Sequence, residues 1–550
     1  MTKIGRAWML ACAASTLWAA PVIMPNGIVN AASNRPVALP GSALARGGLF
    51  SIYGTGLGPA TGVSASSFPL PTTLVEVSIN VTIGGTSLSA ILVFVSAGQI
   101  NGILRSDTPA GRASFRVTYR GETSPPVTAE VVASSFGLIT YSGGGLAVAH
   151  NFGDDGSLTL NTPANSARPG QIVQVYGTGL GPITAPDVTA PPVGNLEGSF
   201  EIVVGGVSAR RLYAGRSPCC AGLDQINFEA PVEAPSGCYV PVVVRAGQTY
   251  SNAGTIALAA GGGACQDRGN PFTEVLGAGS SGTLGLIELS RVALRVSLLG
   301  LNLDSIIDTS TASFFRADPT FFNSGFSLPP PGTCTAFAMP LSSAELDVTP
   351  FPVPVNLLDA GGALALGGPG GTREVPRTPF GHYEAQVGGG LSLPGFPPSQ
   401  PPYLNAGNYR VTGPGGRDIG TFTAELTIPS LLEWTNRDQI SSVDRAQALR
   451  LTWTGDASGE VVMVFGFSID AAQSVSGAFV CQAGGERGSF NVPAWVLSTL
   501  PVSASISGVP VGALMIARSS LASPARFTAR GLDLGVFSYN LASGKLVGYR

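Results

Sequence analysis

Ile52-Tyr53-Gly54-Thr55-Gly56-Leu57-Gly58-Pro59 returns as Val175-Tyr176-Gly177-Thr178-Gly179-Leu180-Gly181-Pro182, 123 residues further along the chain. An alternating apolar run precedes each copy, and proline-containing coil follows it. Glycine adopts positive φ values without steric cost, so the stretch predicts a tight corner at the end of a strand. A phosphate-binding loop would need a helix after its glycines, and the coil argues against one. The glycines expected to form the two corners are Gly54, Gly56, Gly58, Gly177, Gly179 and Gly181.

Further landmarks follow both copies in the same order, at offsets from 121 to 127 residues. They are the Gly-Gly pairs at 84–85 and 205–206, the Gln-Ile-Asn tripeptides at 99–101 and 225–227, and the apolar runs at 115–119 and 240–244, with Ser124 and Ser251 beyond them. A repeat of this length is one domain. Within it, short runs such as 75–81 alternate between apolar and polar residues and end at glycine or proline turns. That alternation predicts β-sandwiches in which one face of each strand is buried.

These motifs, with Ser-Pro-Cys-Cys-Ala-Gly-Leu-Asp-Gln-Ile-Asn-Phe at 217–228, resemble the IPT/TIG-like immunoglobulin fold. More narrowly, they resemble the Solibacter C-terminal domain family, a paired domain of exported Acidobacteria proteins. The resemblance covers roughly residues 35 to 262. It implies an extracellular pair of sandwiches, and the family has no assigned activity to carry over.

Composition places the chain among multidomain β-proteins. Its 550 residues exceed one ordinary hydrophobic core, and 74 glycines with 43 prolines predict many turns between short strands. Charged residues make up 11% of the chain, with a formal net charge of −3, and no basic patch indicates nucleic-acid binding. The expected class is all-β, with two IPT/TIG-like repeats followed by one or two further sandwiches.

The first residues are typical of a Sec signal peptide. Lys3 and Arg6 precede an apolar run at 7–20, and small residues gather at Ala31 and Ala32, where we expect cleavage. A lipoprotein signal using Cys12 is the alternative, although almost no apolar stretch precedes that cysteine. Charged residues interrupt the apolar run 284–303, so we predict no transmembrane segment and a secreted or cell-surface location.

Removal of the leader would leave six cysteines, an even set that indicates disulfides in an exported chain. They are Cys219, Cys220, Cys238, Cys265, Cys334 and Cys481. The first four fall in or just after the second repeat and predict two bridges there, with three pairings open. A bridge to Cys238 would pin the loop that holds Cys219 and Cys220. The remaining two predict a bridge across the C-terminal half, unless Cys334 pairs with Cys265 instead.

These features predict five segments. They are a signal peptide at 1–32, repeat 1 at 33–138, repeat 2 at 139–268, a β-rich domain with proline- and glycine-rich loops at 269–430, and a C-terminal sandwich at 431–550.

Catalytic patterns are weak throughout the sequence. His150 and His382 stand without a partnered nucleophile, and no Gly-x-Ser-x-Gly elbow occurs. The acidic pairs at 154–155 and 304/308 are of the kind that cleaves glycosides or holds calcium. The stretch 154–157 is more typical of a tight turn, and the alternating oxygen ligands of a calcium loop are absent. We therefore predict no catalytic residue, cofactor or metal site.

Trp434, beside Asn436 and Arg437, is the candidate for an exposed aromatic ligand contact, whereas Trp453 is expected in a core. The leading hypothesis is a noncatalytic extracellular binding, adhesion or scaffold protein whose partner is a polysaccharide or a protein. The alternative is a secreted hydrolase or inhibitor with its active surface in residues 270–550.

Overall fold

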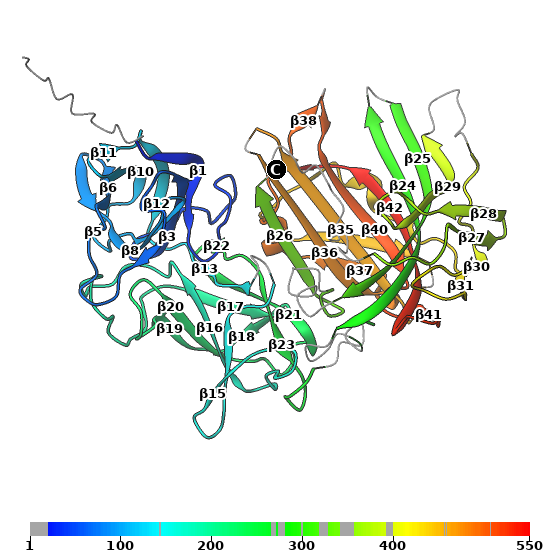
Figure 1. Ribbon diagram of the computed structural model, residues 1–550, viewed down its shortest axis with the longest axis horizontal. Helices are drawn as coiled ribbons and strands as arrows, with labels where there is room; N and C mark the ends of the chain where they lie inside the picture. Colours follow the sequence, from blue (N-terminus) through cyan, green and yellow to red (C-terminus); the bar gives the residue numbers. More distant parts are fainter. Residues whose placement is uncertain are drawn as a thin grey trace, which may run out of the picture.

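The computed structural model describes residues 20–141, 145–265, 271–272, 275, 281–298, 301–317, 328–340, 357–391, 400–455, 457, 459–472, 474–506 and 508–550. Figure 1 shows three β-rich units in chain order: repeat 1 in blue, repeat 2 in cyan to green, and a large C-terminal unit. The helical turns of the described residues are short, comprising α2 (Ala494–Leu497), η4 (Arg437–Gln439) and η5 (Gly485–Arg487).

Repeat 1 is a sandwich of two sheets. One sheet has the order β1 (Val22–Asn30), β3 (Leu49–Thr55), β9 (Gln99–Ile103), β8 (Ile91–Val95) and β4 (Val63–Ser64). The other has the order β2 (Leu44–Ala45), β12 (Val127–Val132), β10 (Gly111–Tyr119), β6 (Val77–Ile83) and β5 (Thr73–Leu74), with β7 (Thr86–Ser89) and β11 (Glu122–Thr123) attached. Strand β6 buries Val77, Ile79, Val81 and Ile83 and turns its polar residues outward, as the alternation predicted.

Repeat 2 has the same strand order at its centre. Its first sheet is β15 (Leu158–Leu160), β14 (Ala149–Phe152), β16 (Ile172–Thr178), β20 (Asp224–Glu229) and β19 (Arg211–Arg216), with β13 (Gly137–Leu138) attached. Its second sheet is β18 (Val207–Ala209), β17 (Phe200–Val204), β21 (Gly237–Ala246) and β22 (Thr249–Tyr250), with β23 (Gly254–Leu258) attached. The order β16-β20-β19 repeats β3-β9-β8, and β23-β21-β17 repeats β12-β10-β6.

One side-chain contact also repeats. The Val117 backbone N–H donates to Ser124 Oγ at 3.0 Å, and the Val244 N–H donates to Ser251 Oγ at 3.0 Å. In both repeats, the serine beyond the strand therefore accepts a hydrogen bond from the corresponding backbone N–H group.

The C-terminal unit is built on a nine-stranded sheet that spans most of its width (Figure 1). Its strands are, in order, β26 (Cys334–Pro340), β36 (Val475–Gly484), β35 (Val461–Asp470), β40 (Gly512–Ser519), β42 (Leu534–Leu546), β24 (Gly282–Leu298), β25 (Leu301–Ala317) and β29 (Tyr383–Leu391), with β41 (Ala525–Phe527) attached to β42. Four neighbouring strands from 431–550 (β36, β35, β40 and β42) lie between β26 on one side and β24, β25 and β29 on the other, all four of which come from 269–430. The predicted boundary at residue 430 therefore divides a hydrogen-bonded sheet rather than two domains.

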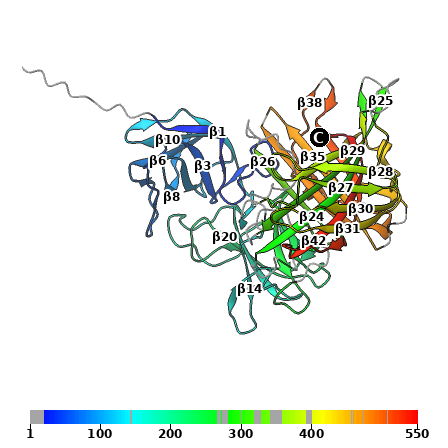
Figure 2. The same cartoon turned by 45° about the vertical axis from the view of Figure 1, so that its right-hand side comes forward.

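Two smaller sheets pack on the large one. The first is β28 (Gly371–Pro376), β27 (Ala363–Gly368), β30 (Gly407–Gly413) and β31 (Phe422–Ile428), which shares a core with β24, β25 and β42 (Figure 2). The second is β32 (Glu433–Trp434), β34 (Leu449–Thr454) and β37 (Ser489–Val492), which shares a core with β35, β36 and β40. Two short pairs complete the unit, β33 (Ser442–Val443) with β43 (Gly548–Tyr549) and β38 (Ser505–Ile506) with β39 (Val509–Pro510).

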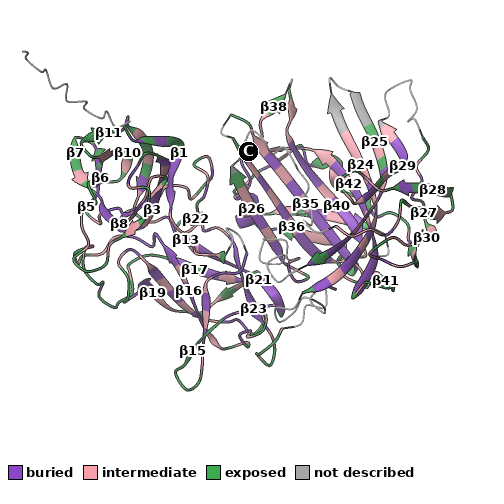
Figure 3. Ribbon diagram, viewed as in Figure 1, coloured by how far each residue is buried: buried purple, intermediate pink, exposed green. Residues whose placement is uncertain are grey.

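Strand β21 connects repeat 2 to the C-terminal unit because both of its faces are buried (Figure 3). Val240, Val242 and Val244 face the core of repeat 2, whereas Val243 belongs to the core around β35 and β36. A strand covered on both sides has a continuous apolar sequence, which explains why alternation is lost along 238–244.

Strand β1 revises the N-terminal boundary. Ile23, Ile28 and Val29 are buried in repeat 1, and β1 pairs with β3. The expected cleavage near Ala31 or Ala32 would remove this strand and is at odds with the fold. Residues 1–19, which hold the start of the predicted leader, lie outside the described residues.

Candidate functional site

The two glycine corners lie at the ends of β3 and β16, and the glycines serve two different purposes. Gly56, Gly179 and Gly181 have φ values of 63°, 104° and 143°, as the sequence predicted. Gly54, Gly58 and Gly177 are not among the residues with positive φ, which corrects that part of the prediction.

Close backbone approach is what requires glycine at these three positions. A Cβ on Gly54 would collide with the Val22 carbonyl oxygen, and one on Gly177 would collide with the Gly137 carbonyl oxygen. At Gly58 it would lie 3.0 Å from the Ser96 carbonyl oxygen.

The second corner lies at the junction of the two repeats. The Ser135 N–H, at the end of repeat 1, donates to the Gly179 carbonyl at 2.9 Å. From β1, Asn30 Nδ2 donates to the carbonyls of Ser135 and Thr178, each at 3.2 Å. The motif that marks the repeats is therefore also the surface through which they dock.

A buried ion pair between Arg216 and Asp224 closes this junction. Their side chains are 1% and 0% exposed. Arg216 Nη2 donates to the Gly47 carbonyl of repeat 1 at 2.7 Å and to the Gly181 carbonyl of the corner at 2.6 Å. Asp224 Oδ2 accepts the Leu180 N–H at 2.7 Å. Burial raises the pKa of the Asp224 carboxyl, and the Arg216 charge opposes that rise.

Arg216 and Asp224 also bracket the loop that distinguishes repeat 2 from repeat 1. Twenty residues separate Gly205 from Gln225, whereas fifteen separate Gly84 from Gln99. The loop folds on itself, with Cys220 N donating to the Ser217 carbonyl and Leu223 N to the Cys220 carbonyl, both at 3.2 Å. Its Gly222 carbonyl accepts Thr178 Oγ at 2.6 Å. The Thr178 hydroxyl in turn accepts the Leu49 N–H at 2.7 Å, so the loop is fixed to both repeats.

The structure joins Cys219 to Cys220, Cys238 to Cys265, and Cys334 to Cys481. The first two bridges are one of the three pairings that the sequence left open. Cys238 does not pin the loop, because the loop cysteines bridge each other. Cys334 and Cys481 lie directly opposite in the register of β26 and β36.

A groove of about 530 Å³ lies beside the Cys219–Cys220 bridge. It is lined by Ile139, Val148, Tyr176, Ser217, Pro218, Cys219 and Leu223. Tyr176 comes from the strand that leads into the second corner, and the residues from Ser217 to Leu223 come from the inserted loop. The lining holds no charged side chain.

Next to the groove, the outer face of the sheet carries amides and aromatic rings in register. His150 lies opposite Gln174, which lies opposite Asn227, and Tyr176 lies opposite Gln225. Hydrogen bonds orient these side chains. Gln174 Nε2 donates to Tyr176 Oη at 2.6 Å, and Gln225 Nε2 donates to Asn227 Oδ1 at 3.0 Å.

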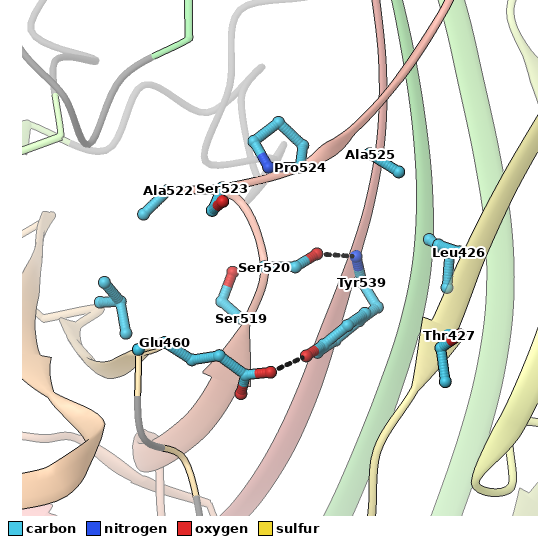
Figure 4. Close-up of a pocket in the computed structure, with 12 residues that line it drawn as sticks. Leu426, Thr427, Glu460, Ser519, Ser520, Ala522, Ser523, Pro524, Ala525 and Tyr539 are labelled. Atoms are coloured by element: carbon cyan, nitrogen blue, oxygen red, sulfur yellow. Dashed lines mark hydrogen bonds between the residues drawn. The ribbon is translucent and has the colours of Figure 1, made fainter.

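A second pocket, of about 380 Å³, lies in the C-terminal unit between β31, β35, β40 and β42 (Figure 4). Its lining includes one carboxylate, Glu460, whose Oε1 accepts Tyr539 Oη at 2.7 Å. Arg518 Nε donates to Glu460 Oε2, which neutralises the carboxylate charge. Burial and the Glu460 hydrogen bond raise the pKa of Tyr539, so its hydroxyl stays protonated. The pocket thus offers hydroxyl groups and an already paired charge.

Trp434, expected at the surface, is buried. It is 6% exposed, lies opposite Trp453 in the register of β32 and β34, and donates from Nε1 to Asn436 Oδ1 at 2.8 Å. Asn436, one of the two polar neighbours that suggested exposure, instead satisfies the indole N–H. Trp453, expected in a core, is 3% exposed.

The remaining polar candidates have structural partners. Asp308 accepts Arg291 Nε at 2.6 Å and the backbone N–H groups of Tyr403 and Leu404. Asp154 pairs with Arg168 at 2.5 Å in an exposed turn. His382 lies within hydrogen-bond distance of Thr378 and Glu384. Within the described part of the chain, no three His, Cys, Asp or Glu residues form a group that could hold a metal ion.

Sequence reasoning missed the Arg216–Asp224 pair. The signal that could have found it was the position of two charged residues immediately beside the inserted loop, in a chain with only 11% charged residues.

Among the described residues, no helix is long and apolar enough to cross a bilayer.

Comparison with known proteins gives only distant likeness. No family description and no curated protein sequence matches the chain. Among solved structures, the chain is similar to the I9–I11 tandem of titin, with 7% identity, a TM-score of 0.11, and coverage of 74% of this chain and 96% of that one. It is also similar to the FN1–FN3 domains of chicken CNTN1, with 10% identity, a TM-score of 0.12, and coverage of 75% and 100%.

The chain is also similar to domains 5–6 of the S-layer protein SbsC, with 12% identity, a TM-score of 0.14, and coverage of 43% of this chain and 98% of that one. Likeness at this level assigns no ligand or activity. By its own sheet topology, the chain is an all-β protein of tandem immunoglobulin-like sandwiches.

Proposed function

We propose that the chain is an exported, noncatalytic binding, adhesion or scaffold protein of the Solibacter-type paired-domain class, acting on an extracellular polysaccharide or protein. Three disulfides support an oxidising compartment, since cytosolic thiols are kept reduced. The leader, in this proposal, is removed upstream of Val22, so that β1 stays in repeat 1.

The observation that carries the proposal is that one buried side chain, Arg35, bonds to both of the other units. Arg35, which is 5% exposed, extends from repeat 1 and donates from Nη1 to the Tyr250 carbonyl of repeat 2 at 2.6 Å. Its Nη2 donates to Thr499 Oγ in the C-terminal unit at 3.4 Å. Burial lowers the pKa of Arg35 to about 10. Units fixed in this way present their loops and faces in constant geometry, which suits a scaffold or a multivalent binder.

The pocket in the C-terminal unit favours binding over hydrolysis. Acid–base cleavage of a glycosidic bond uses two carboxyl groups on either side of the bond. Glu460 is the one carboxylate in the lining of this pocket, and its two oxygens already accept hydrogen bonds from Arg518 and Tyr539.

The test is to screen the secreted protein on a polysaccharide array and, in parallel, on a panel of glycosidase, esterase and peptidase substrates. Binding without turnover is expected. Turnover that persists in the purified protein and is abolished by Glu460→Gln would overturn the proposal in favour of the hydrolase.

A further inference from the structure

We propose that the groove beside the Cys219–Cys220 bridge of repeat 2 binds a neutral hexose unit of a polysaccharide. This inference rests on the proposed function and assigns its ligand site. It depends on three features of the groove: the inserted loop that builds it, the rigid apolar surface that the loop presents, and the uncharged polar residues beside it.

The inserted loop of repeat 2 builds one side of the groove, and the matching turn of repeat 1 is five residues shorter. In repeat 1, the corner bonds directly to the short turn before β9, with Gly54 N donating to the Gly98 carbonyl at 3.1 Å and Leu57 N to the Ala97 carbonyl at 3.0 Å. In repeat 2, the Leu180 N–H is satisfied by Asp224 Oδ2 instead. The loop from Ser217 to Leu223 therefore does not take the place of the short turn of repeat 1, and its residues line the groove together with Tyr176 as a wall.

The wall is apolar and conformationally restricted. A bridge between adjacent cysteines closes a small ring through the backbone, so the loop has few conformations to lose when a ligand binds. Cys219 and Pro218 are exposed, and Val148, Ile139 and the Tyr176 ring form the rest of the surface. The apolar C–H face of a pyranose ring is complementary to a lining of sulfur, proline and aromatic carbon.

The residues beside the groove favour a neutral ligand with many hydroxyl groups. Gln225 lies opposite Tyr176 in register, and the neighbouring row holds His150, the buried Gln174 and Asn227. Amide groups both donate and accept hydrogen bonds, which suits hydroxyl groups of either orientation. Arg216 and Asp224 lie beneath the loop, buried and paired with each other, so they offer no exposed charge to an anionic polymer.

The internal repeat supplies a matched control for the test. Tyr176 and Tyr53 occupy the same position in the two repeats, and each is partly exposed. Wild type, Tyr176→Ser, Tyr53→Ser and the double variant Cys219→Ser with Cys220→Ser are applied to an array of neutral glucans, mannans and galactans together with uronate-containing and sulfated polymers. Affinities are then measured by calorimetry on the oligosaccharide that binds best.

We expect wild type to bind neutral glycans, Tyr176→Ser and the double cysteine variant to lose about tenfold or more in affinity, and Tyr53→Ser to bind as wild type does. Circular dichroism and thermal melting verify that each variant is folded. Three results would each overturn the groove assignment. They are equal affinity of wild type and Tyr176→Ser, binding to acidic polymers alone, and no binding to neutral glycans. None of these results involves turnover, which is what would overturn the proposed function.

Discussion

Replacing Arg216 with methionine tests whether the buried ion pair holds the two repeats together. The substitution keeps an unbranched apolar side chain in the site but removes the guanidinium that bonds the Gly47 and Gly181 carbonyls. It also leaves the Asp224 carboxylate, 0% exposed, without its counter-ion. An uncompensated buried charge costs about 3–5 kcal/mol. For a cooperative unit of this size, that cost lowers the melting temperature by roughly 10 °C.

Thermal unfolding is monitored by far-ultraviolet circular dichroism, and limited proteolysis probes the segment between the repeats. The multidomain chain need not unfold in one step, so proteolysis identifies which unit has loosened. Arg105→Met is the matched control. Arg105 also pairs with an aspartate, Asp107, but the two side chains are 40% and 58% exposed, and such a pair contributes below about 1 kcal/mol.

The double variant Arg216→Met with Asp224→Leu separates the net contribution of the pair from the penalty of an orphaned charge. Replacing both partners with apolar residues is often nearly neutral, so the double variant should melt closer to wild type than Arg216→Met does. If Arg216→Met melts within 2 °C of wild type, or if the double variant is as unstable as the single one, the junction does not depend on this pair in the way proposed.

Three other predictions concern residues away from the groove. Burial raises the pKa of Glu288 to about 7, so the folded protein keeps a proton that the unfolded chain releases near pH 4.5. The free energy of unfolding should therefore fall by up to about 3 kcal/mol as pH rises between these values. Urea unfolding measured from pH 4 to 8 should show this fall in wild type and a smaller pH dependence in Glu288→Gln. Trp434→Ala should cost about 3–5 kcal/mol without changing glycan affinity, and a loss of affinity in a fully stable variant would restore Trp434 as a contact residue. A chain that starts at Ser33 lacks β1, and repeat 1 should lose roughly 5 kcal/mol of stability as a result. N-terminal sequencing of the secreted protein should accordingly give a start upstream of Val22. A mature terminus at Ser33, with a melting temperature equal to that of the longer chain, would refute this prediction.

In the C-terminal half, the sequence pattern indicated individual strands but not how they pair. The strands around 409–412, 421–428 and 449–454 were recognisable from apolar alternation, because one buried face imposes a period of two, and the strand around 461–465 from a continuous apolar run. Their grouping was not, because β24 pairs in parallel with β42, more than 230 residues later. Nothing local in either strand specifies that partner, so the sequence contained no sign that the expected boundary at 430 divides one sheet.

The sequence by itself determined the all-β class, the two repeats and their corners, since glycine geometry and strand periodicity are local properties of the chain. The tertiary structure decided which surfaces face each other. Trp434 is buried because the nine-stranded sheet covers it, β1 belongs to repeat 1 because it pairs with β3, and Arg216 is a junction residue because Gly47, 169 residues earlier, docks beside it. Such contacts depend on how completed units pack, and packing is a property of surfaces that no single stretch of sequence contains.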